Sequence, residues 1–322
     1  MSERFIDVHH HLLPDFYVDA IFAQGYSEVG GRDTPEWSPA LSLEVLDRNN
    51  IEMAITSISA PATHFGDDRA AQELARRCNE YSAQLVRTHP SRFGTFATLP
   101  MPFVEGAVEE AVYALDTLKA EGLVLLSSNN DGSYLGDPRF DPLMAALNER
   151  DAVVFVHPAI PVVADRIDVK IPAFAMEFTF DTTRAIFNLV YNGTMERYPR
   201  IKWVVAHAGG AVPYLVERFA LLWFTDDGLV ARAPWGARHY LAQLYYDTAL
   251  SANKSAFGSL SQLVGDDHIL FGSDFPFAPE LMTTASVMAV DDQMDLSDDT
   301  QHWVRRGSAL QLLPAVAERL VN

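Results

Sequence analysis

The chain has 322 residues, of which 48% are hydrophobic and 21% charged, so it can bury a sizeable core and form one large domain or two small ones. Its formal net charge of −19 argues against binding to nucleic-acid phosphates or to anionic lipid, both of which an acidic surface would repel. Its one cysteine, Cys78, cannot form an intramolecular disulfide, and no apolar run reaches the ~20 residues that cross a bilayer. These features predict a soluble cytoplasmic protein without nucleic-acid or membrane partners.

An apolar, β-branched run opens the chain and ends in three histidines, Phe5 to His11. Such a run predicts a strand, on which side chains alternate, so that His9 and His11 point one way and His10 the other. Two imidazoles on one face of a strand form a compact chelating pair for a divalent metal. The alternatives are a chance polar run or the remnant of a purification tag, and ligands elsewhere in the chain would decide between these interpretations.

Residues 12–40 are rich in proline and glycine, which predicts an irregular segment that folds as a small insertion over the rest of the molecule. From there on, strand and helix patterns alternate along the chain. Further strands are predicted at 53–58, 92–99, 123–126, 153–157, 202–207, 244–248 and 269–274. Helices are predicted at 42–49, 67–87, 104–120 and 137–150, through 186–190, after 210 to about 224, at 252–264 and near the C-terminus.

Eight short apolar strands, each followed by a helical pattern, favour one architecture. Near-continuous apolar runs indicate strands that are covered on both faces. Eight strand–helix units in a chain of this length fit a (β/α)₈ TIM barrel better than a doubly wound sheet. We therefore predict a single α/β barrel domain over residues 1–322, distorted by a small insertion at 12–40 over the barrel mouth and extended by C-terminal helices.

Polar residues close four of the predicted strands. The first strand ends in His9 and His11, the fifth in His157, the sixth in His207 and the eighth in Asp274. A lone histidine at a strand end is more often structural, but active sites of barrels lie at the C-terminal ends of the strands, where these side chains would meet. Histidine and carboxylate together suit zinc or a similar metal. His9, His11, one further histidine and Asp274 would leave a position open for water or substrate.

Other residues carry weaker signals. His64 follows the second predicted strand and could reach the barrel mouth. Phe178, Phe180 and Phe275 could pack on an aromatic ring near the mouth, although ordinary core positions explain them equally well. Cys78 fits a buried structural thiol, since nothing around it suggests activation.

The strand-end residues belong to four short motifs that follow one another in a fixed order along the chain. They are Asp-Val-His-His-His at 7–11, Val-His-Pro at 156–158, His-Ala-Gly-Gly at 207–210 and Gly-Ser-Asp-Phe-Pro-Phe at 272–277. Together they resemble the amidohydrolase superfamily, and specifically its decarboxylase branch, which includes aminocarboxymuconate-semialdehyde, 6-methylsalicylate and resorcylate decarboxylases. The segments at 92–100 and 134–138 are similar to the 6-methylsalicylate decarboxylase type.

The resemblance implies a role for each strand-end residue. It makes His9, His11, His157 and Asp274 the ligands of one divalent metal ion, expected to be Zn²⁺ with Mn²⁺ as the alternative. It makes His207 the catalytic acid or base beside the metal, with Asp274 as the other candidate proton donor. No other cofactor is implied. The expected partners are a small aromatic carboxylate as substrate and a second copy of the chain in a homodimer.

Two departures from the relatives narrow these expectations. Two-metal members carry a bridging carboxylated lysine at the end of strand four, whereas Ser127 and Ser128 stand there in this chain, which supports a single metal. Members that act on the acyclic semialdehyde use arginines to hold a second carboxylate. Those positions align with Ser42 and Leu222 here, so we expect a substrate with one carboxylate.

The predicted activity is the metal-dependent, non-oxidative decarboxylation of an ortho-hydroxybenzoate of the 6-methylsalicylate or salicylate type. A proton from His207 or Asp274 would reach the ring carbon before carbon dioxide leaves, with the carboxylate and ortho oxygen held at the metal. The same ligand set would serve a metal-dependent hydrolase of a lactone or amide, which is the alternative prediction. A metal-binding barrel without catalysis is a third.

Overall fold

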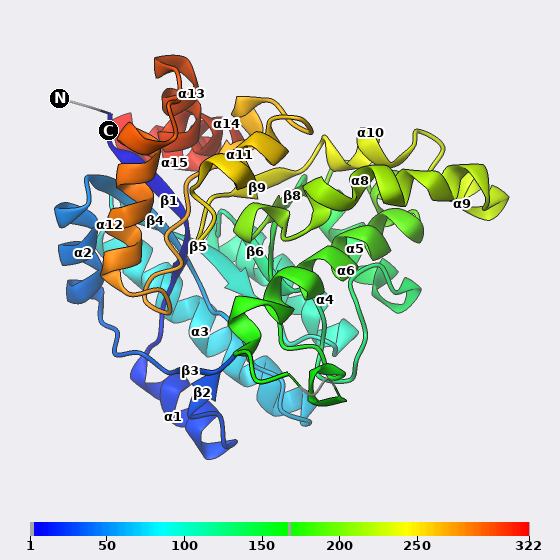
Figure 1. The fold of residues 1–322 in the computed structure, drawn as a ribbon. Coiled ribbons are helices and arrows are strands. Elements are labelled where there is room, and N and C mark those ends of the chain that lie inside the picture. Colours follow the sequence, from blue (N-terminus) through cyan, green and yellow to red (C-terminus); the bar gives the residue numbers. More distant parts are fainter. Residues whose placement is uncertain (1–2, 167–168, 322) are drawn as a thin grey trace.

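The computed structural model describes residues 3–166 and 169–321, in which eight parallel strands form one nearly closed barrel (Figure 1). The strands pair in chain order, so each lies between its predecessor and its successor. They are β1 (Phe5–His11), β4 (Ile51–Ser57), β5 (Phe93–Thr98), β6 (Gly122–Leu126), β7 (Val153–His157), β8 (Lys202–Val205), β9 (Tyr245–Asp247) and β10 (Ile269–Leu270). The predicted α/β barrel of eight strands is confirmed.

Backbone hydrogen bonds between β1 and the residues that follow β10 close the barrel. The Val8 N–H donates to the Phe271 carbonyl at 3.0 Å. The Asp274 N–H then donates to the His9 carbonyl at 2.8 Å, and the His11 N–H donates to the Phe275 carbonyl at 2.7 Å. The histidine run therefore lies directly beside the last strand end, although the two are separated by most of the chain.

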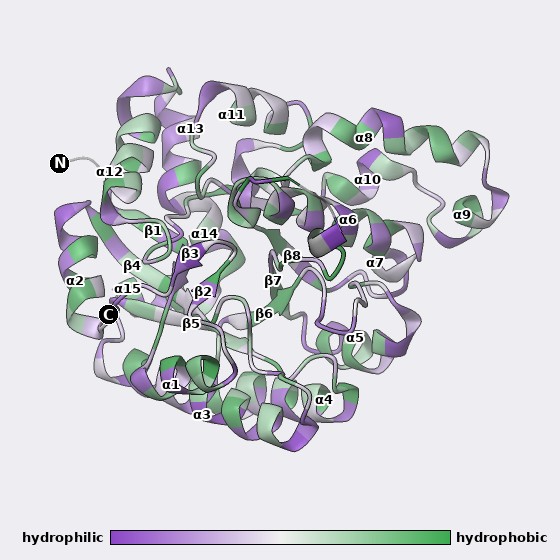
Figure 2. Cartoon of the chain, turned by 60° about the horizontal axis from the view of Figure 1, so that its bottom comes forward, coloured by the Kyte–Doolittle hydropathy of each residue, from purple (hydrophilic) through white to green (hydrophobic). Residues whose placement is uncertain are grey.

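Helices surround the barrel, with hydrophobic and hydrophilic residues on different faces (Figures 1 and 2). They are α2 (Pro39–Arg48), α3 (Asp68–Thr88), α4 (Val104–Val112), α5 (Asp141–Asn148), α6 (Glu177–Tyr191), α7 (Thr194–Arg197), α8 (Val212–Ala220), α9 (Asp227–Arg232), α10 (Ala237–Leu241), α11 (Lys254–Leu260) and α12 (Glu280–Met288). The C-terminal extension adds α13 (Asp298–His302), α14 (Ser308–Leu312) and α15 (Pro314–Val321). Among the described helices, none combines the length and apolar character that a membrane span requires.

A register shift in β1 turns the histidines toward the barrel interior. Ile6 and Val8 belong to a buried cluster with Phe155 and with residues of α14 and α15. Between Asp7 and His10, β1 advances three residues while β4 advances two. The extra residue reverses the alternation, as a β-bulge does. His9 therefore also packs on Phe155, with ring centroids 4.9 Å apart.

The segment after β1 is more regular than predicted. It contains a helix, α1 (Asp15–Ala23), and a two-stranded hairpin, β2 (Glu28–Val29) with β3 (Arg32–Asp33). Tyr17 and Ile21, one turn apart on α1, are buried against Leu12 and Ile58. The expectation of an irregular segment is therefore wrong over α1, because tertiary packing of these two side chains stabilises a helix too short to show a clear sequence periodicity.

Candidate metal centre and catalytic site

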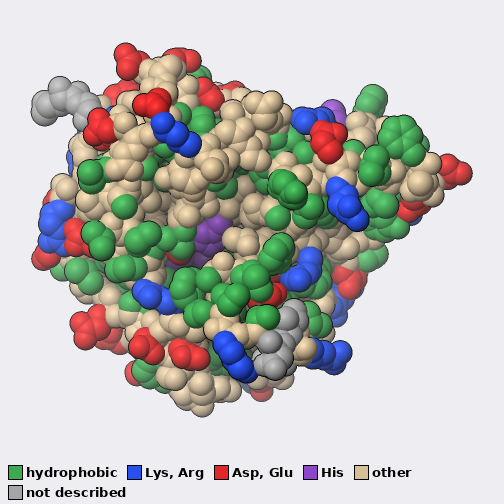
Figure 3. Space-filling view, viewed as in Figure 1, with side chains coloured by type: hydrophobic (Ala, Val, Ile, Leu, Met, Phe, Trp, Pro, Cys, Tyr) green, Lys and Arg blue, Asp and Glu red, His purple; other side chains and the backbone are tan. Residues whose placement is uncertain are grey.

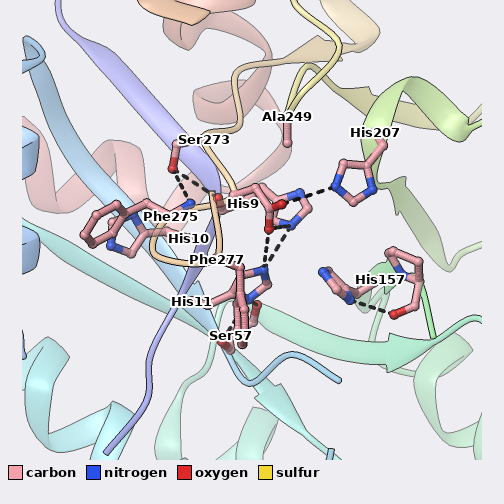
Figure 4. Close-up of polar contacts among 12 residues, drawn as sticks. His9, His10, His11, Ser57, His157, His207, Ala249, Ser273, Phe275 and Phe277 are labelled. Atoms are coloured by element: carbon pink, nitrogen blue, oxygen red, sulfur yellow. Dashed lines mark hydrogen bonds and ion pairs between the residues drawn. The ribbon is translucent and has the colours of Figure 1, made fainter. Parts of the chain in front are cut away.

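Four buried side chains gather at the C-terminal ends of the strands, as the sequence predicted. His9 and His11 come from β1, His157 from the end of β7 and Asp274 from the segment after β10, and one ligand atom from each lies within 4.8 Å of the others. The Asp274 Oδ1 atom is 3.2 Å from His9 Nε2 and 3.1 Å from His11 Nε2. Figure 4 shows these histidines and His207 around one centre, with His10 turned away toward Phe275.

The second ring nitrogen of each of these three histidines faces an oxygen that can accept a hydrogen bond, and His11 Nδ1 also lies 3.3 Å from the Ser57 hydroxyl. His9 Nδ1 faces Asp247 Oδ2 at 2.7 Å, His11 Nδ1 faces the Ser57 carbonyl at 3.3 Å, and His157 Nδ1 faces the Pro158 carbonyl at 2.9 Å. These acceptors favour a proton on each Nδ1, which turns the three Nε2 atoms toward the centre. This is the arrangement that metal-binding histidines adopt in proteins, so the residues present fit a metal ion.

The electrostatics of the cluster also suit a cation. Burial lowers the pKa of His9, but the Asp247 and Asp274 carboxylates outweigh it and raise that pKa to about 10. Burial lowers the pKa of His11, and burial together with the neighbouring histidines lowers that of His157 well below its ordinary value. Two of the imidazoles are thus neutral and ready to bind, while the carboxylates favour positive charge at the centre.

His207 lies beside this cluster but is held differently. Its Nε2 atom is 3.6 Å from Asp274 Oδ2, and both ring nitrogens are buried without a hydrogen-bond partner among the described residues. The ring borders the cavity described below. His207 therefore borders the cavity with a ring that no hydrogen bond from the described residues holds, which suits proton transfer rather than a structural role.

The backbone at both predicted catalytic residues is left-handed. His207 has a φ of 54° and Asp274 a φ of 62°, conformations that cost about 1–3 kcal/mol each for residues other than glycine. Gly210, which follows in the same turn, has a φ of 61°, and a Cβ atom there would lie 2.1 Å from the Thr179 carbonyl oxygen. The His-Ala-Gly-Gly motif is thus required by the tight turn that brings His207 to the cluster.

A cavity of about 470 Å³ opens from the cluster toward solvent. His157, His207 and Asp274 form its polar end, and its other walls are largely apolar. The apolar lining residues are Val29, Phe174, Ala175, Phe178, Leu250, Phe277, Ala278, Pro279 and Met282. Figure 3 shows histidine at the bottom of a hollow that is rimmed by hydrophobic side chains.

The weaker sequence signals have mixed outcomes. Of the three phenylalanines, Phe178 lines the cavity, whereas Phe180 and Phe275 do not. Phe275 packs on His10 instead, with ring centroids 5.2 Å apart. His64 pairs with Asp68 at 2.8 Å and is not among the residues that line the cavity. Cys78 is fully buried, and burial raises the pKa of its thiol, as expected for a structural residue.

Arg32 is a cavity residue that the sequence reasoning missed. It belongs to β3, lines the cavity and donates a hydrogen bond to the Phe277 carbonyl at 3.2 Å. Ser42, where the alignment sought an arginine, is buried and bonded to His10 Nε2 at 2.9 Å. A guanidinium therefore reaches the mouth from the hairpin, and no sequence pattern near Arg32 indicated this.

The end of β6, where two-metal relatives carry a lysine, is occupied by a hydrogen-bond network. Ser127 and Ser128 donate to Asp181 Oδ2 at 2.5 and 2.7 Å, and the Tyr134 hydroxyl donates to Asp181 Oδ1 at 2.5 Å. Asp181 is fully buried on α6, the helix that also carries Phe178. This network joins one wall of the cavity to the barrel.

Replacing Asp181 by alanine is expected to destabilise the fold by about 2 kcal/mol, because two buried serine hydroxyls and a half-buried tyrosine hydroxyl lose their acceptor. The midpoint of urea unfolding measures the effect. Asp68→Ala, which alters an exposed carboxylate on α3, is the control. Equal midpoints for the two variants would contradict the structural role of Asp181.

Comparisons with known proteins agree with this geometry. The family model described as Amidohydrolase matches residues 6–315. Decarboxylase yanB of Aspergillus niger is 34% identical over 96% of this chain and 87% of that protein. The 6-methylsalicylic acid decarboxylase of Penicillium expansum is 33% identical over 96% of both. A crystal structure of 5-carboxyvanillate decarboxylase from Novosphingobium aromaticivorans, with manganese and a nitrobenzoic acid bound, has a TM-score of 0.85 at 20% identity and covers 97% of this chain and 96% of its own.

Proposed function

Since the chain belongs to the amidohydrolase family, in its decarboxylase branch, we propose that it decarboxylates a small ortho-hydroxybenzoate of the 6-methylsalicylate or salicylate type. The chain is a carboxy-lyase of this family. One observation carries the substrate assignment: a buried set of four ligand groups lies at the polar end of a cavity with largely apolar walls. Such a cavity suits a molecule with an apolar ring and one polar edge.

We propose that His9, His11, His157 and Asp274 bind a single divalent metal ion. Such an ion would fix the substrate carboxylate and ortho oxygen together and stabilise negative charge on that oxygen. A set with three histidines favours Zn²⁺. Mn²⁺ is the alternative, since the 5-carboxyvanillate decarboxylase was crystallised with manganese.

The residues of the chain then account for the order of the reaction. Direct loss of carbon dioxide would leave an unstable carbanion on the aromatic ring. His207 borders the cavity, and its ring nitrogens have no hydrogen-bond partner among the described residues, so we assign it the protonation of the ring carbon, which comes first. The carboxylate then leaves as carbon dioxide, and its bonding electrons restore the aromatic ring. Asp274 Oδ2 lies 3.6 Å from His207 Nε2, where it can orient the imidazole.

The apolar walls serve to hold the ring. Phe178 and Phe277 line the cavity next to the ligand set, where their faces and edges can pack on an aromatic substrate. Phe178 also contacts the edge of His157, with ring centroids 6.4 Å apart. This packing would place the substrate carboxylate at the polar end of the cavity and keep water from the protonated ring.

Metal analysis combined with a substrate panel tests the proposal. We expect one Zn²⁺ or Mn²⁺ per chain, release of carbon dioxide and the corresponding phenol from salicylate or 6-methylsalicylate, loss of this activity on chelation, and its return with either metal. Cleavage of lactones or amides, without carbon dioxide release from any hydroxybenzoate, would instead identify a hydrolase. A protein that binds metal and turns over neither class would contradict both.

We also propose that residues 1–322 form a single domain, that the chain acts in the cytoplasm and that it forms a homodimer, as the resemblance implies. Light scattering on the purified protein tests the dimer directly. A monomer at micromolar concentration would contradict it.

A further inference from the structure

A buried carboxylate outside the ligand set contacts two parts of the site. Asp247 ends β9, is fully buried and is not among the residues that line the cavity. Its side chain cannot reach a substrate there, so any effect on the reaction has to pass through its neighbours. Those neighbours are His9 and the backbone of His207.

One oxygen of Asp247 fixes the ring of His9. Oδ2 lies 2.7 Å from His9 Nδ1, and neither atom is exposed to solvent. Because a carboxylate only accepts hydrogen bonds, His9 carries a proton on Nδ1 and turns Nε2 toward the centre, where its lone pair would bind a metal. His11 and His157 have neutral carbonyl partners at this position, so His9 is the imidazole of the set whose orienting partner is charged.

The other oxygen of Asp247 fixes the turn that carries His207. Oδ1 accepts hydrogen bonds from the His207 N–H at 2.8 Å and from the Ala249 N–H at 3.0 Å. His207 has a left-handed backbone, which other contacts must stabilise. The carboxylate therefore ties the position of the proposed proton donor to the ring orientation of a proposed ligand.

We propose that Asp247 is a positioning residue that selects the metal-binding tautomer of His9 and anchors the His207 turn through its two oxygens. The inference rests on the proposed metal centre. A metal-free scaffold would need Asp247 only as a buried hydrogen-bond acceptor. The two roles differ in what they predict for asparagine and alanine at this position.

Asp247→Asn preserves the shape of the side chain but replaces one oxygen by an amide donor. If the amide oxygen keeps the two backbone N–H groups, the NH₂ group faces His9 Nδ1. That nitrogen must then accept, and the proton moves to Nε2, where it blocks the metal. In the opposite orientation, the NH₂ group would face the His207 and Ala249 N–H groups, and the two hydrogen bonds that these groups donate would be lost.

The test is the affinity of the apo-protein for Zn²⁺ and Mn²⁺, measured by competition with a chelator. Asp247→Asn is expected to weaken binding by about 10–100-fold, as loss of an outer-sphere partner does. Asp247→Ala removes the acceptor without placing a donor against His9, so it should lose more stability but less metal affinity than Asp247→Asn. Asp181→Asn, at another fully buried carboxylate, should bind metal like the wild type.

The inference would be overturned if Asp247→Asn bound metal like the wild type. It would also be overturned if Asp247→Ala lost more metal affinity than Asp247→Asn, in parallel with its larger loss of stability. Nitrogen NMR of the zinc-loaded wild type gives a further check, since a proton on His9 Nε2 would overturn the inference. Wild-type protein that binds neither metal contradicts the proposed function itself, which separates the two failures.

Discussion

Replacing His11 by alanine is expected to abolish metal binding and decarboxylation together. His11 Nε2 lies 3.1 Å from both His9 Nε2 and Asp274 Oδ1, in the middle of the proposed ligand set. Its removal takes away one of four ligands. The affinity loss should therefore exceed the roughly 10–100-fold that follows loss of an outer-sphere partner. Metal content after dialysis, followed by carbon dioxide release, measures both effects, and His9→Ala should behave alike.

His10→Gln is the matched control for this prediction. His10 is equally buried and adjacent in sequence, but its ring bonds to Asp7 at 3.0 Å and to the Ser42 hydroxyl at 2.9 Å, away from the centre. The glutamine amide can donate to Asp7 and accept from the Ser42 hydroxyl, so the variant should keep most of its bound metal. Equal metal loss in His10→Gln and His11→Ala would show that the histidine run acts only through stability.

His207→Asn is expected to lower kcat by about 10²–10⁴-fold while leaving metal content unchanged. His207 is outside the proposed ligand set, so its loss removes the proton donor and not the metal. Metal analysis and steady-state kinetics on the same preparation separate the two properties. His64→Asn, at a histidine that pairs with Asp68 outside the cavity, should match the wild type in both.

Asp274→Asn distinguishes the two proton donors that the sequence left open. Asp274 belongs to the ligand set, so this variant should lose metal as well as activity. A His207→Asn enzyme that keeps its kcat would assign proton transfer to Asp274 instead. Restored activity of Asp274→Asn at saturating metal would confirm His207 as the donor.

The architecture could be predicted because each strand is a short apolar run whose two faces are both buried, one in the barrel interior and the other against the surrounding helices. Ile6 and Val8 on one side and Phe5 on the other are all buried, which explains the continuous pattern of β1. The helix α1 could not be predicted, because its stability comes from Tyr17 and Ile21 packing on residues distant in sequence. The register shift in β1 depends on pairing with β4 and leaves no local trace.

The sequence predicted those residues of the site that stand at the end of an apolar strand pattern. Asp247 closes β9 in the structure, but the strand predicted at 244–248 runs one residue past it, so Asp247 did not stand out as a residue that ends a strand. Arg32 and Asp181 had no such pattern. Arg32 reaches the cavity through a hairpin, and Asp181 meets Ser127 from a helix 54 residues away, so only the three-dimensional arrangement reveals them.

The hydrogen bonds between β1 and the residues after β10, which close the barrel and are called the seam below, have a consequence for biosynthesis. His11 and Asp274, which face each other across the seam, are 263 residues apart in the chain. At translation rates of roughly 5–20 residues per second, the histidine pair leaves the ribosome tens of seconds before its carboxylate partner exists. The complete set of proposed ligands arises only when the eighth strand docks on the first, so we expect the metal to bind after Asp274 has been synthesised.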